Sequence, residues 1–197
     1  MTATFDELPI AAAWRHEASR EGFEVVFFGT VPRGRRMEGW TAAVEDAEAW
    51  VVGYEIVVDE SWRTTSARVW ARSREGEREV RVQADGSGKW LIDGAVADDL
   101  DGCIDIDLES SACTNTLPVH RLALGEGEAG ESPAAYVRAL DLRVERLEQR
   151  YFRVAADGDP GRPRFHYSAP RFDYDDDLVY DSRGLVLHYP GIATRIL

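Results

Sequence analysis

The sequence has 197 residues, of which 44% are hydrophobic and 30% charged, a composition typical of a folded globular domain and not of a disordered or fibrous chain. Its 36 acidic and 23 basic side chains give a net charge of -13. Because this charge repels phosphate backbones and anionic lipid surfaces, we expect no nucleic-acid partner.

Hydropathy excludes a membrane span, since no stretch of the sequence approaches the roughly 20 apolar residues that cross a bilayer. The N-terminal residues lack the basic start and the uninterrupted apolar core of a signal peptide. We therefore expect a cytoplasmic protein that is not embedded in a membrane, and this compartment argues against a disulfide between Cys103 and Cys113. A lipid ligand would have to be taken up by the protein.

Short runs of β-branched and aromatic residues, separated by turn residues, predict strands in the N-terminal half. Residues 24–30 (EVVFFGT) form one run, and residues 50–60 (WVVGYEIVVDE) are apolar on nearly both faces, which indicates a central strand. In residues 65–73, Val69 and its apolar neighbours at period two alternate with charged residues such as Arg68.

The same pattern continues through the C-terminal half. Strands are predicted over residues 117–124 (LPVHRLAL), 164–170, 172–181 and 184–190. Their regular spacing predicts an all-β fold, in which residues 1–197 form a single antiparallel domain built as a barrel, roll or sandwich.

Residues 134–154 fit two periods. Leu140, Val144 and Leu147 lie at helical spacing, whereas Leu140, Leu142 and Val144 also alternate as in a strand. The many short strands elsewhere favour a strand here, with a short helix considered at residues 131–137.

The stretch around Asp105 has two different faces. Ile104, Ile106 and Leu108 point one way and predict a core face, while Asp105 and Asp107 point the other way. The acidic face either lies in water, as half of an antiparallel sheet commonly does, or lines a polar cavity or bonds to arginines of a neighbouring strand.

Three groups of residues are candidates for a chemical site. Asp105 and Asp107 would stand roughly 6 to 7 Å apart, compatible with an acid and base for glycoside hydrolysis, but any such pair on a strand passes this test. Cys103, Cys113 and His120 match no zinc spacing, so no metal is expected. The acidic loop at residues 125–130 (GEGEAG) has the glycine spacing of a dinucleotide site but would repel a pyrophosphate, so no cofactor is expected.

Several segments occur in the order found in one bacterial family. They are residues 13–17 (AWRHE), 53–62 (GYEIVVDESW), 88–94 (GKWLIDG), 100–108 (LDGCIDIDL), 113–122 (CTNTLPVHRL), 148–154 (EQRYFRV) and 180–191 (YDSRGLVLHYPG). The chain thus resembles the family called putative glycolipid-binding. It departs from the family pattern where SSAC replaces the usual proline before Thr114, and where His120 stands in place of a customary arginine.

The resemblance implies an antiparallel spiral β-roll with few or no helices, a curled sheet similar to lipoprotein carriers that hold lipid chains on a concave face. It makes residues 134–154 a strand, implies binding of a glycolipid or another amphipathic small molecule, and supplies no catalytic residues. The candidate ligand contacts are the aromatic residues Tyr54, Trp62, Trp90 and Tyr151 and the polar residues Asp93, Asp105, Asp107, Asn115 and Arg121.

Two other functions stay open from the sequence. One is a hydrolase or isomerase that uses Asp105 and Asp107, with His120 as a further candidate residue. The other is a protein-interaction module without a small-molecule site, which recruits a partner or a second copy through exposed strand edges. For each candidate aromatic residue, packing in the core is the competing explanation. The sequence specifies no oligomeric state.

Overall fold

The computed structural model describes residues 5–18, 20–155 and 161–197. Within these ranges, one large sheet has 14 strands in the order β10-β13-β14-β15-β16-β17-β1-β2-β3-β4-β5-β6-β7-β8, with every pair antiparallel. The order is nearly that of the chain, and the first and last strands, β1 and β17, pair with each other.

The strands from the N-terminal half of the chain are β1 (Ala11–His16), β2 (Arg20–Val31), β3 (Gly34–Glu45), β4 (Glu48–Asp59), β5 (Thr64–Ser73), β6 (Gly76–Ala84), β7 (Trp90–Ile92) and β8 (Ala95–Val96). Those from the C-terminal half are β10 (Ala129–Glu131), β13 (Arg150–Arg153), β14 (Arg164–Ala169), β15 (Tyr174–Tyr180), β16 (Val186–Tyr189) and β17 (Ala193–Arg195). Since β8 and β10 end the strand order, the sheet is an open roll, which confirms the predicted all-β curled sheet.

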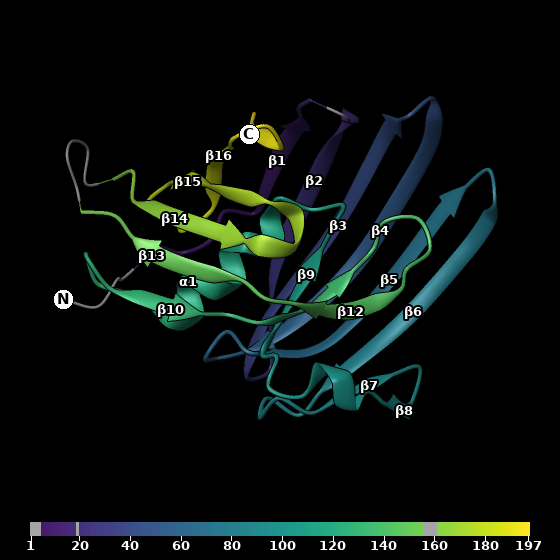
Figure 1. Ribbon diagram of the computed structural model, residues 1–197, viewed down its shortest axis with the longest axis horizontal. Helices are drawn as coiled ribbons and strands as arrows, with labels where there is room; N and C mark the ends of the chain where they lie inside the picture. Colours follow the sequence, from purple (N-terminus) through teal and green to yellow (C-terminus); the bar gives the residue numbers. More distant parts are fainter. Residues whose placement is uncertain (1–4, 19, 156–160) are drawn as a thin grey trace.

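A second sheet lies inside the roll. It contains β9 (Asp105–Leu108), β11 (Ala134–Val137) and β12 (Val144–Leu147) in the order β12-β11-β9. In Figure 1, β2–β6 lie behind and β13–β15 in front, with β9 and the helix α1 between them. The pair β9 and β11 is parallel, so the prediction of a wholly antiparallel fold is wrong for this pair.

The interior is filled by side chains from both sheets. One cluster joins the inner face of the long strands to β9 and includes Trp14, Tyr54, Trp90 and Ile106. A second cluster lies under β13–β16 and is centred on aromatic side chains such as Tyr151. The inner sheet thus occupies much of the concave space that the resemblance assigned to a ligand.

The segment predicted as a strand at residues 117–124 is a helix. A 3₁₀ turn, η2 (Cys113–Asn115), leads into α1 (Thr116–Leu122), where Pro118 lies in the first turn and loses no helical hydrogen bond. The helix ends at Ala123, which is left-handed with φ 46° and donates its N–H to Val119 O. No helix in the described residues is long and apolar enough to cross a membrane.

The ambiguous segment at residues 134–154 is confirmed as strand, in three pieces: β11, β12 and β13. The chain reverses between β11 and β12, where Arg138 N donates to Arg143 O and Leu142 has φ 54°. The helix considered at residues 131–137 does not form, because β11 pairs on both edges, with β9 and with β12. Two further 3₁₀ turns are η1 (Asp98–Leu100) and η3 (Pro170–Phe172).

The outer face of the long strands is partly aromatic. Phe27 packs edge-on against Trp40, and Trp40 packs edge-on against Trp70, with 6.4 Å between ring centroids in both pairs. The Trp70 ring lies close over Gly53, where a Cβ would be 2.3 Å from the indole. The predicted alternation in β5 is confirmed, since Val69 is buried and Arg68 exposed.

Candidate functional site: a pocket beside Asp107

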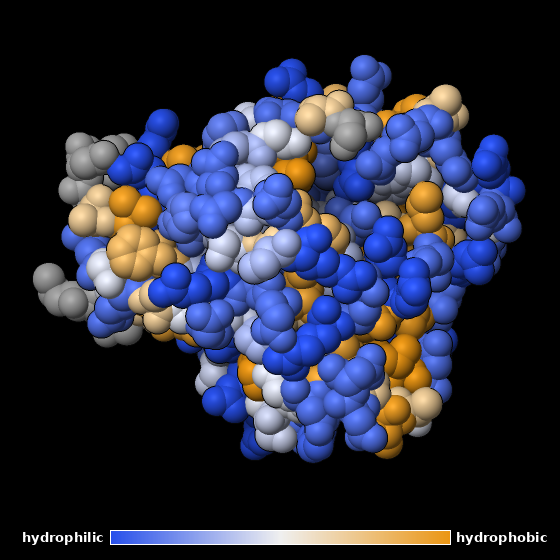
Figure 2. Space-filling model, in the orientation of Figure 1, coloured by the Kyte–Doolittle hydropathy of each residue, from blue (hydrophilic) through white to orange (hydrophobic). Residues whose placement is uncertain are grey.

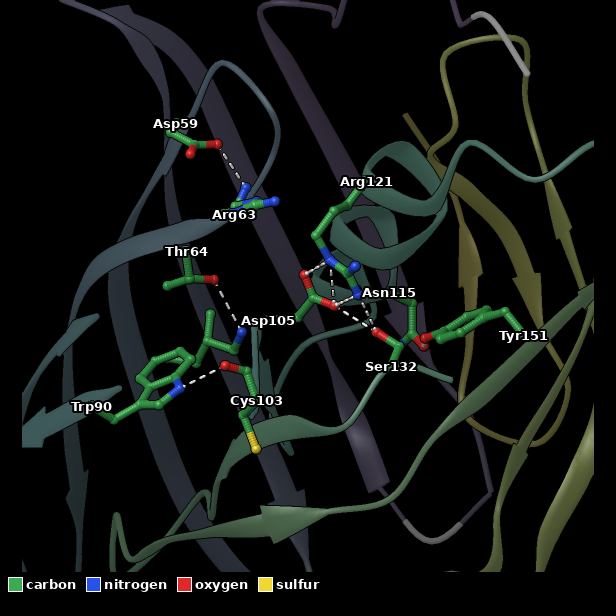
Figure 3. A network of polar contacts seen from close by, with 11 residues as sticks. Asp59, Arg63, Thr64, Trp90, Cys103, Asp105, Asn115, Arg121, Ser132 and Tyr151 are labelled. Carbon is green, nitrogen blue, oxygen red and sulfur yellow. Dashed lines mark hydrogen bonds and ion pairs between the residues drawn. The ribbon is translucent and has the colours of Figure 1, made fainter. Parts of the chain in front are cut away.

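Asp105 and Asp107 project from β9 into different surroundings. Asp105 is fully buried and its carboxylate is held by Arg121 of α1, with Arg121 Nε 2.8 Å from Oδ1 and Nη2 2.6 Å from Oδ2. Ser132 also donates its hydroxyl to Oδ2 at 2.5 Å. Figure 3 shows this closed group, in which each charge is paired.

Asp107 is hydrogen-bonded but has no cationic partner in residues 5–18, 20–155 and 161–197. Thr114 Oγ1 donates to Oδ1 at 2.7 Å and Gln149 Nε2 donates to Oδ2 at 2.6 Å. Burial raises the pKa of the Asp107 carboxyl to about 6, against the lowering effect of these two hydrogen bonds. At neutral pH the carboxyl is therefore mostly ionised.

Asp107 also lines a pocket of about 310 Å³ between one end of the roll, the inner sheet and the strands β14–β16. We call it the Asp107 pocket. Its lining comes from distant parts of the chain: His16, Glu17, Arg20, Glu45, Asp107, Leu108, Glu109, Ser111, Asn115, Tyr136, Leu147, Tyr167, Ala169, Phe172, Tyr174, Tyr189, Gly191 and Ile192.

One side of the pocket is aromatic. Tyr167, Tyr174 and Tyr189 pack against one another, with ring centroids 5.2 to 5.9 Å apart. Tyr136 of β11 lies 5.3 Å from the ring of Phe172, which follows β14 and is 44% exposed. Such rings provide flat apolar faces, and their hydroxyls provide hydrogen bonds.

The other side of the pocket is charged. Arg20 pairs with Glu45, with Nη2 3.1 Å from Oε2, and donates Nη1 to Glu109 O at 2.8 Å. Its guanidinium also lies over the Trp50 ring, 4.9 Å from the centroid. Arg20 is thus already occupied by groups of the protein.

His16, at the end of β1, is the unusual residue of this pocket. It is 5% exposed, and neither ring nitrogen has a hydrogen-bond partner among the residues that the structure describes. Burial and the nearby Arg20 lower the pKa of His16 to about 4, although the Ile192 carbonyl acts in the opposite direction. The ring is therefore neutral at pH 7.

Of the predicted ligand contacts, the structure brings two to this pocket, Asp107 and Asn115. Asn115 Oδ1 accepts a hydrogen bond from Tyr151 at 2.7 Å, so Tyr151 supports the pocket from the core behind Asn115. Asp105 and Arg121 are not among the lining residues; they bind each other and hold α1 against β9.

The remaining candidates lie elsewhere. Tyr54 is fully buried and donates to Glu24 at 2.7 Å, and Trp90 is buried and donates its indole N–H to Cys103 O at 2.8 Å. Trp62 lines a separate cavity near Phe5, and its ring stacks on the His120 ring with 3.8 Å between the ring centroids. Asp93 is exposed at a turn and accepts a hydrogen bond from Arg81 N.

Two interpretations of the acidic face need correction. The face does not lie in water, because all four residues of β9 are buried. The acid–base pair of Asp105 and Asp107 also does not form in one site, because Arg121 and Ser132 enclose Asp105 while only Asp107 reaches the pocket. The arginine that bonds Asp105 comes from a helix and not from a neighbouring strand.

Sequence reasoning missed most of the pocket, including His16, Arg20 and the tyrosine group. It also missed Glu24, a fully buried carboxylate whose pKa is raised by burial. Glu24 Oε2 accepts from Ala112 N at 2.8 Å, and Oε1 accepts from Ser111 and Tyr54, which fixes the loop after β9. Glu24 could have been found from the sequence, because it is a charged residue at an inward-facing position of a predicted strand.

The cysteines take no part in this pocket. Cys103 and Cys113 are buried free thiols. In the described residues, no group of three or more His, Cys, Asp or Glu side chains is arranged to hold a metal ion.

Comparisons with known proteins agree with this fold. A protein of the DUF1089 family from Pseudomonas aeruginosa has a similar crystal structure, with a TM-score of 0.78 and 27% identity over 98% of this chain and 99% of that chain. A beta-barrel-like protein of the DUF1849 group from Brucella abortus shares the fold at a TM-score of 0.54 and 11% identity, over 98% and 96% of the two chains. No curated protein matches the sequence. The family model described as "Putative glycolipid-binding" matches residues 11–195, and the chain therefore belongs to that family.

Proposed function

We propose that the protein binds the head group of an amphipathic molecule, of the glycolipid class that the family description names, in the Asp107 pocket. The observation that carries this proposal is the division of the pocket into an aromatic side and a polar side. Sugar rings stack on aromatic faces, while carboxylates and amides bond their hydroxyls.

The size of the pocket favours a head group over a whole lipid. Its 310 Å³ lies near the lower end of ligand pockets, which run from about 300 to 1,000 Å³. Phe172 and Ile192 line the pocket and are also exposed, so an apolar tail would leave past these two side chains. The face drawn in Figure 2 is mostly hydrophilic, with hydrophobic residues in small groups among the charged ones.

One observation favours a second function in the same pocket. Asp107, with a pKa near 6, would serve as an acid or base near neutral pH. An Asp107→Asn variant that keeps its fold but loses turnover on a nitrophenyl glycoside would support catalysis. If the wild-type protein and Asp107→Asn turn over the glycoside equally, or if neither does, catalysis by Asp107 is contradicted and binding is the function proposed for the pocket.

Binding is tested with n-octyl-β-D-glucoside, which joins a neutral sugar to a short tail. We expect one molecule per chain, detected by titration calorimetry below the critical micelle concentration, and about tenfold weaker binding in Phe172→Ala, because a ring at the rim is lost. The matched control is Phe27→Ala, which removes a ring of similar exposure, 49%, from the outer face of the sheet.

Equal affinities in the two variants would place the detergent outside the Asp107 pocket and contradict the proposal. Native mass spectrometry of the freshly purified protein, followed by organic extraction, gives an independent measurement. A co-purified lipid that is lost in Phe172→Ala and kept in Phe27→Ala would support it.

A further inference from the structure

The charges that line the Asp107 pocket are strongly unequal. Four carboxylates face one guanidinium, and His16 is neutral. Arg20 is bound to Glu45 and to the Glu109 carbonyl, so no free cation is offered to an anionic ligand among the described lining residues. Arg20 compensates Glu45 and Arg138 interacts with Glu109, so Asp107 and Glu17 supply the uncompensated negative charge that a phosphate or sulfate head group would meet.

The aromatic side of the pocket adds a second, independent preference. Faces of tyrosine and phenylalanine rings attract cations, and several rings around one space recognise ammonium groups. Tyr167, Tyr174 and Tyr189 pack together on the wall of this pocket, and Tyr136 and Phe172 pack together on the same wall.

His16 points to a ligand in its own right. It is buried at the pocket wall, and within the described part of the chain neither of its ring nitrogens is hydrogen-bonded. A neutral imidazole has one nitrogen that accepts a hydrogen bond, which an ammonium N–H would satisfy. A buried polar group without a partner is costly, so a bound donor at this position stabilises the folded protein.

We propose that the head group recognised by the Asp107 pocket carries a positive charge, as an amino sugar or a quaternary ammonium group does. This inference rests on the proposed function, because it requires that an amphipathic ligand enters this pocket. It goes beyond the family description by naming the charge of the head group, with the carboxylates of Asp107 and Glu17 and the tyrosine rings as its recognition elements.

Four probes with the same eight-carbon tail test the charge: octylammonium, octyltrimethylammonium, n-octyl-β-D-glucoside and octyl sulfate. We expect the better of the two cations to bind one-to-one about tenfold more tightly than the glucoside, with octyl sulfate the weakest. Octylammonium donates hydrogen bonds and represents an amino sugar, whereas octyltrimethylammonium interacts with ring faces alone. The tighter binder of the two therefore identifies whether the pocket prefers an amino sugar or a quaternary ammonium group.

Variants separate the pocket from the general negative charge of the chain. Asp107→Asn and Glu17→Gln should each lower the affinity for the cation about tenfold while the glucoside still binds. Glu17 lies outside the buried core, so its variant remains informative if Asp107→Asn fails to fold. Glu77→Gln, at an exposed position of β6, makes the same change in net charge outside the pocket and should leave all affinities unchanged.

The outcomes distinguish this inference from the proposed function. If the glucoside binds in a manner sensitive to Phe172→Ala but the cations bind no better, the inference is overturned and the proposed function stands. If octyl sulfate binds as well as the cations, or if Glu77→Gln weakens the cations as much as Asp107→Asn does, the inference is also overturned. If no probe binds one-to-one, both fall.

Discussion

Arg121 binds the buried carboxylate of Asp105 through two hydrogen bonds, from Nε to Oδ1 at 2.8 Å and from Nη2 to Oδ2 at 2.6 Å. The pair ties α1 to β9 and leaves no part of the Asp105 carboxylate in solvent. A buried ion pair adds little net stability over an apolar pair, but loss of one partner leaves an unpaired charge. This relationship therefore makes Arg121 critical for the fold.

The first prediction is that Arg121→Met lowers the free energy of unfolding by about 3 to 5 kcal/mol, because Asp105 is left as an uncompensated buried charge. The double variant Arg121→Met with Asp105→Asn should regain part of this loss. Urea denaturation measures both. The control is Arg72→Met, which breaks an exposed pair with Glu77 and should cost at most about 1 kcal/mol. An Arg121→Met variant as stable as this control would contradict the buried pair.

The second prediction concerns Gly39, whose backbone lies directly under the ring of Tyr54. A Cβ at Gly39 would be 2.2 Å from Tyr54 Cζ and 2.4 Å from its hydroxyl, which is fixed by the buried Glu24. Gly39→Ala should therefore lower the free energy of unfolding by about 1 to 3 kcal/mol through overpacking. Gly29→Ala on the neighbouring β2, where no atom lies within 4 Å of the added carbon, is the matched control.

Both alanines remove the same flexibility from the unfolded chain, so Gly29→Ala should be neutral or slightly stabilising. The difference between the two denaturation midpoints measures the clash with Tyr54. Equal midpoints would show that Tyr54 moves freely, which the hydrogen bond to Glu24 argues against.

The third prediction is a pH dependence of stability that comes from His16. Its pKa is about 4 in the folded protein, below the ordinary value of 6.5, so the unfolded chain binds a proton first as the pH falls. The stability contributed by the neutral, buried ring is complete above pH 6.5 and is lost as the pH falls towards 4. Between pH 7 and pH 5 this loss amounts to about 2 kcal/mol for one group.

His16→Gln removes this titration, so its stability should fall less than that of the wild-type protein between pH 7 and pH 5. The comparison is needed because other groups act in the same range. His120, whose pKa is also lowered to about 4, adds to the loss, and Asp107, whose pKa is raised to about 6, opposes it. His120 and Asp107 are present in both proteins, so their contributions cancel when the pH-dependent stability of His16→Gln is subtracted from that of the wild-type protein. Parallel pH profiles for the two proteins would argue against a neutral His16.

The fourth prediction is that both cysteines react slowly in the folded protein. Burial raises the pKa of the Cys103 thiol to about 11 and raises that of Cys113 well above its ordinary value, so little thiolate forms at pH 8. A disulfide reagent at pH 8 should label both thiols only after urea is added. Rapid labelling of either thiol without urea would show that the roll opens around it.

Local patterns in the sequence determined the strands. The alternation of Val69 with Arg68 in β5 and the turn residues between runs depend only on neighbours along the chain, so they predicted the long strands of the roll. The helix α1 was missed because Leu117 and Val119 are apolar residues two positions apart, as on one face of a strand. The bond that ties the helix to β9, from Arg121 to Asp105, joins residues 16 positions apart. Periodicity allowed a barrel, a roll or a sandwich, and the resemblance to the family predicted that the sheet is a curled roll.

Which face of β9 is enclosed, and by what, was decided by tertiary structure alone. The sequence determined that Asp105 and Asp107 lie on one side of a strand. Their different surroundings come from Arg121, 16 residues away, and from Gln149, 42 residues away from Asp107. The pocket likewise combines residues of β1, β9, β11, β14 and β16, whose side chains come together because the open roll curls around the inner sheet. Periodicity reports the direction of a side chain, whereas burial, charge pairing and pocket lining depend on contacts between residues distant in sequence.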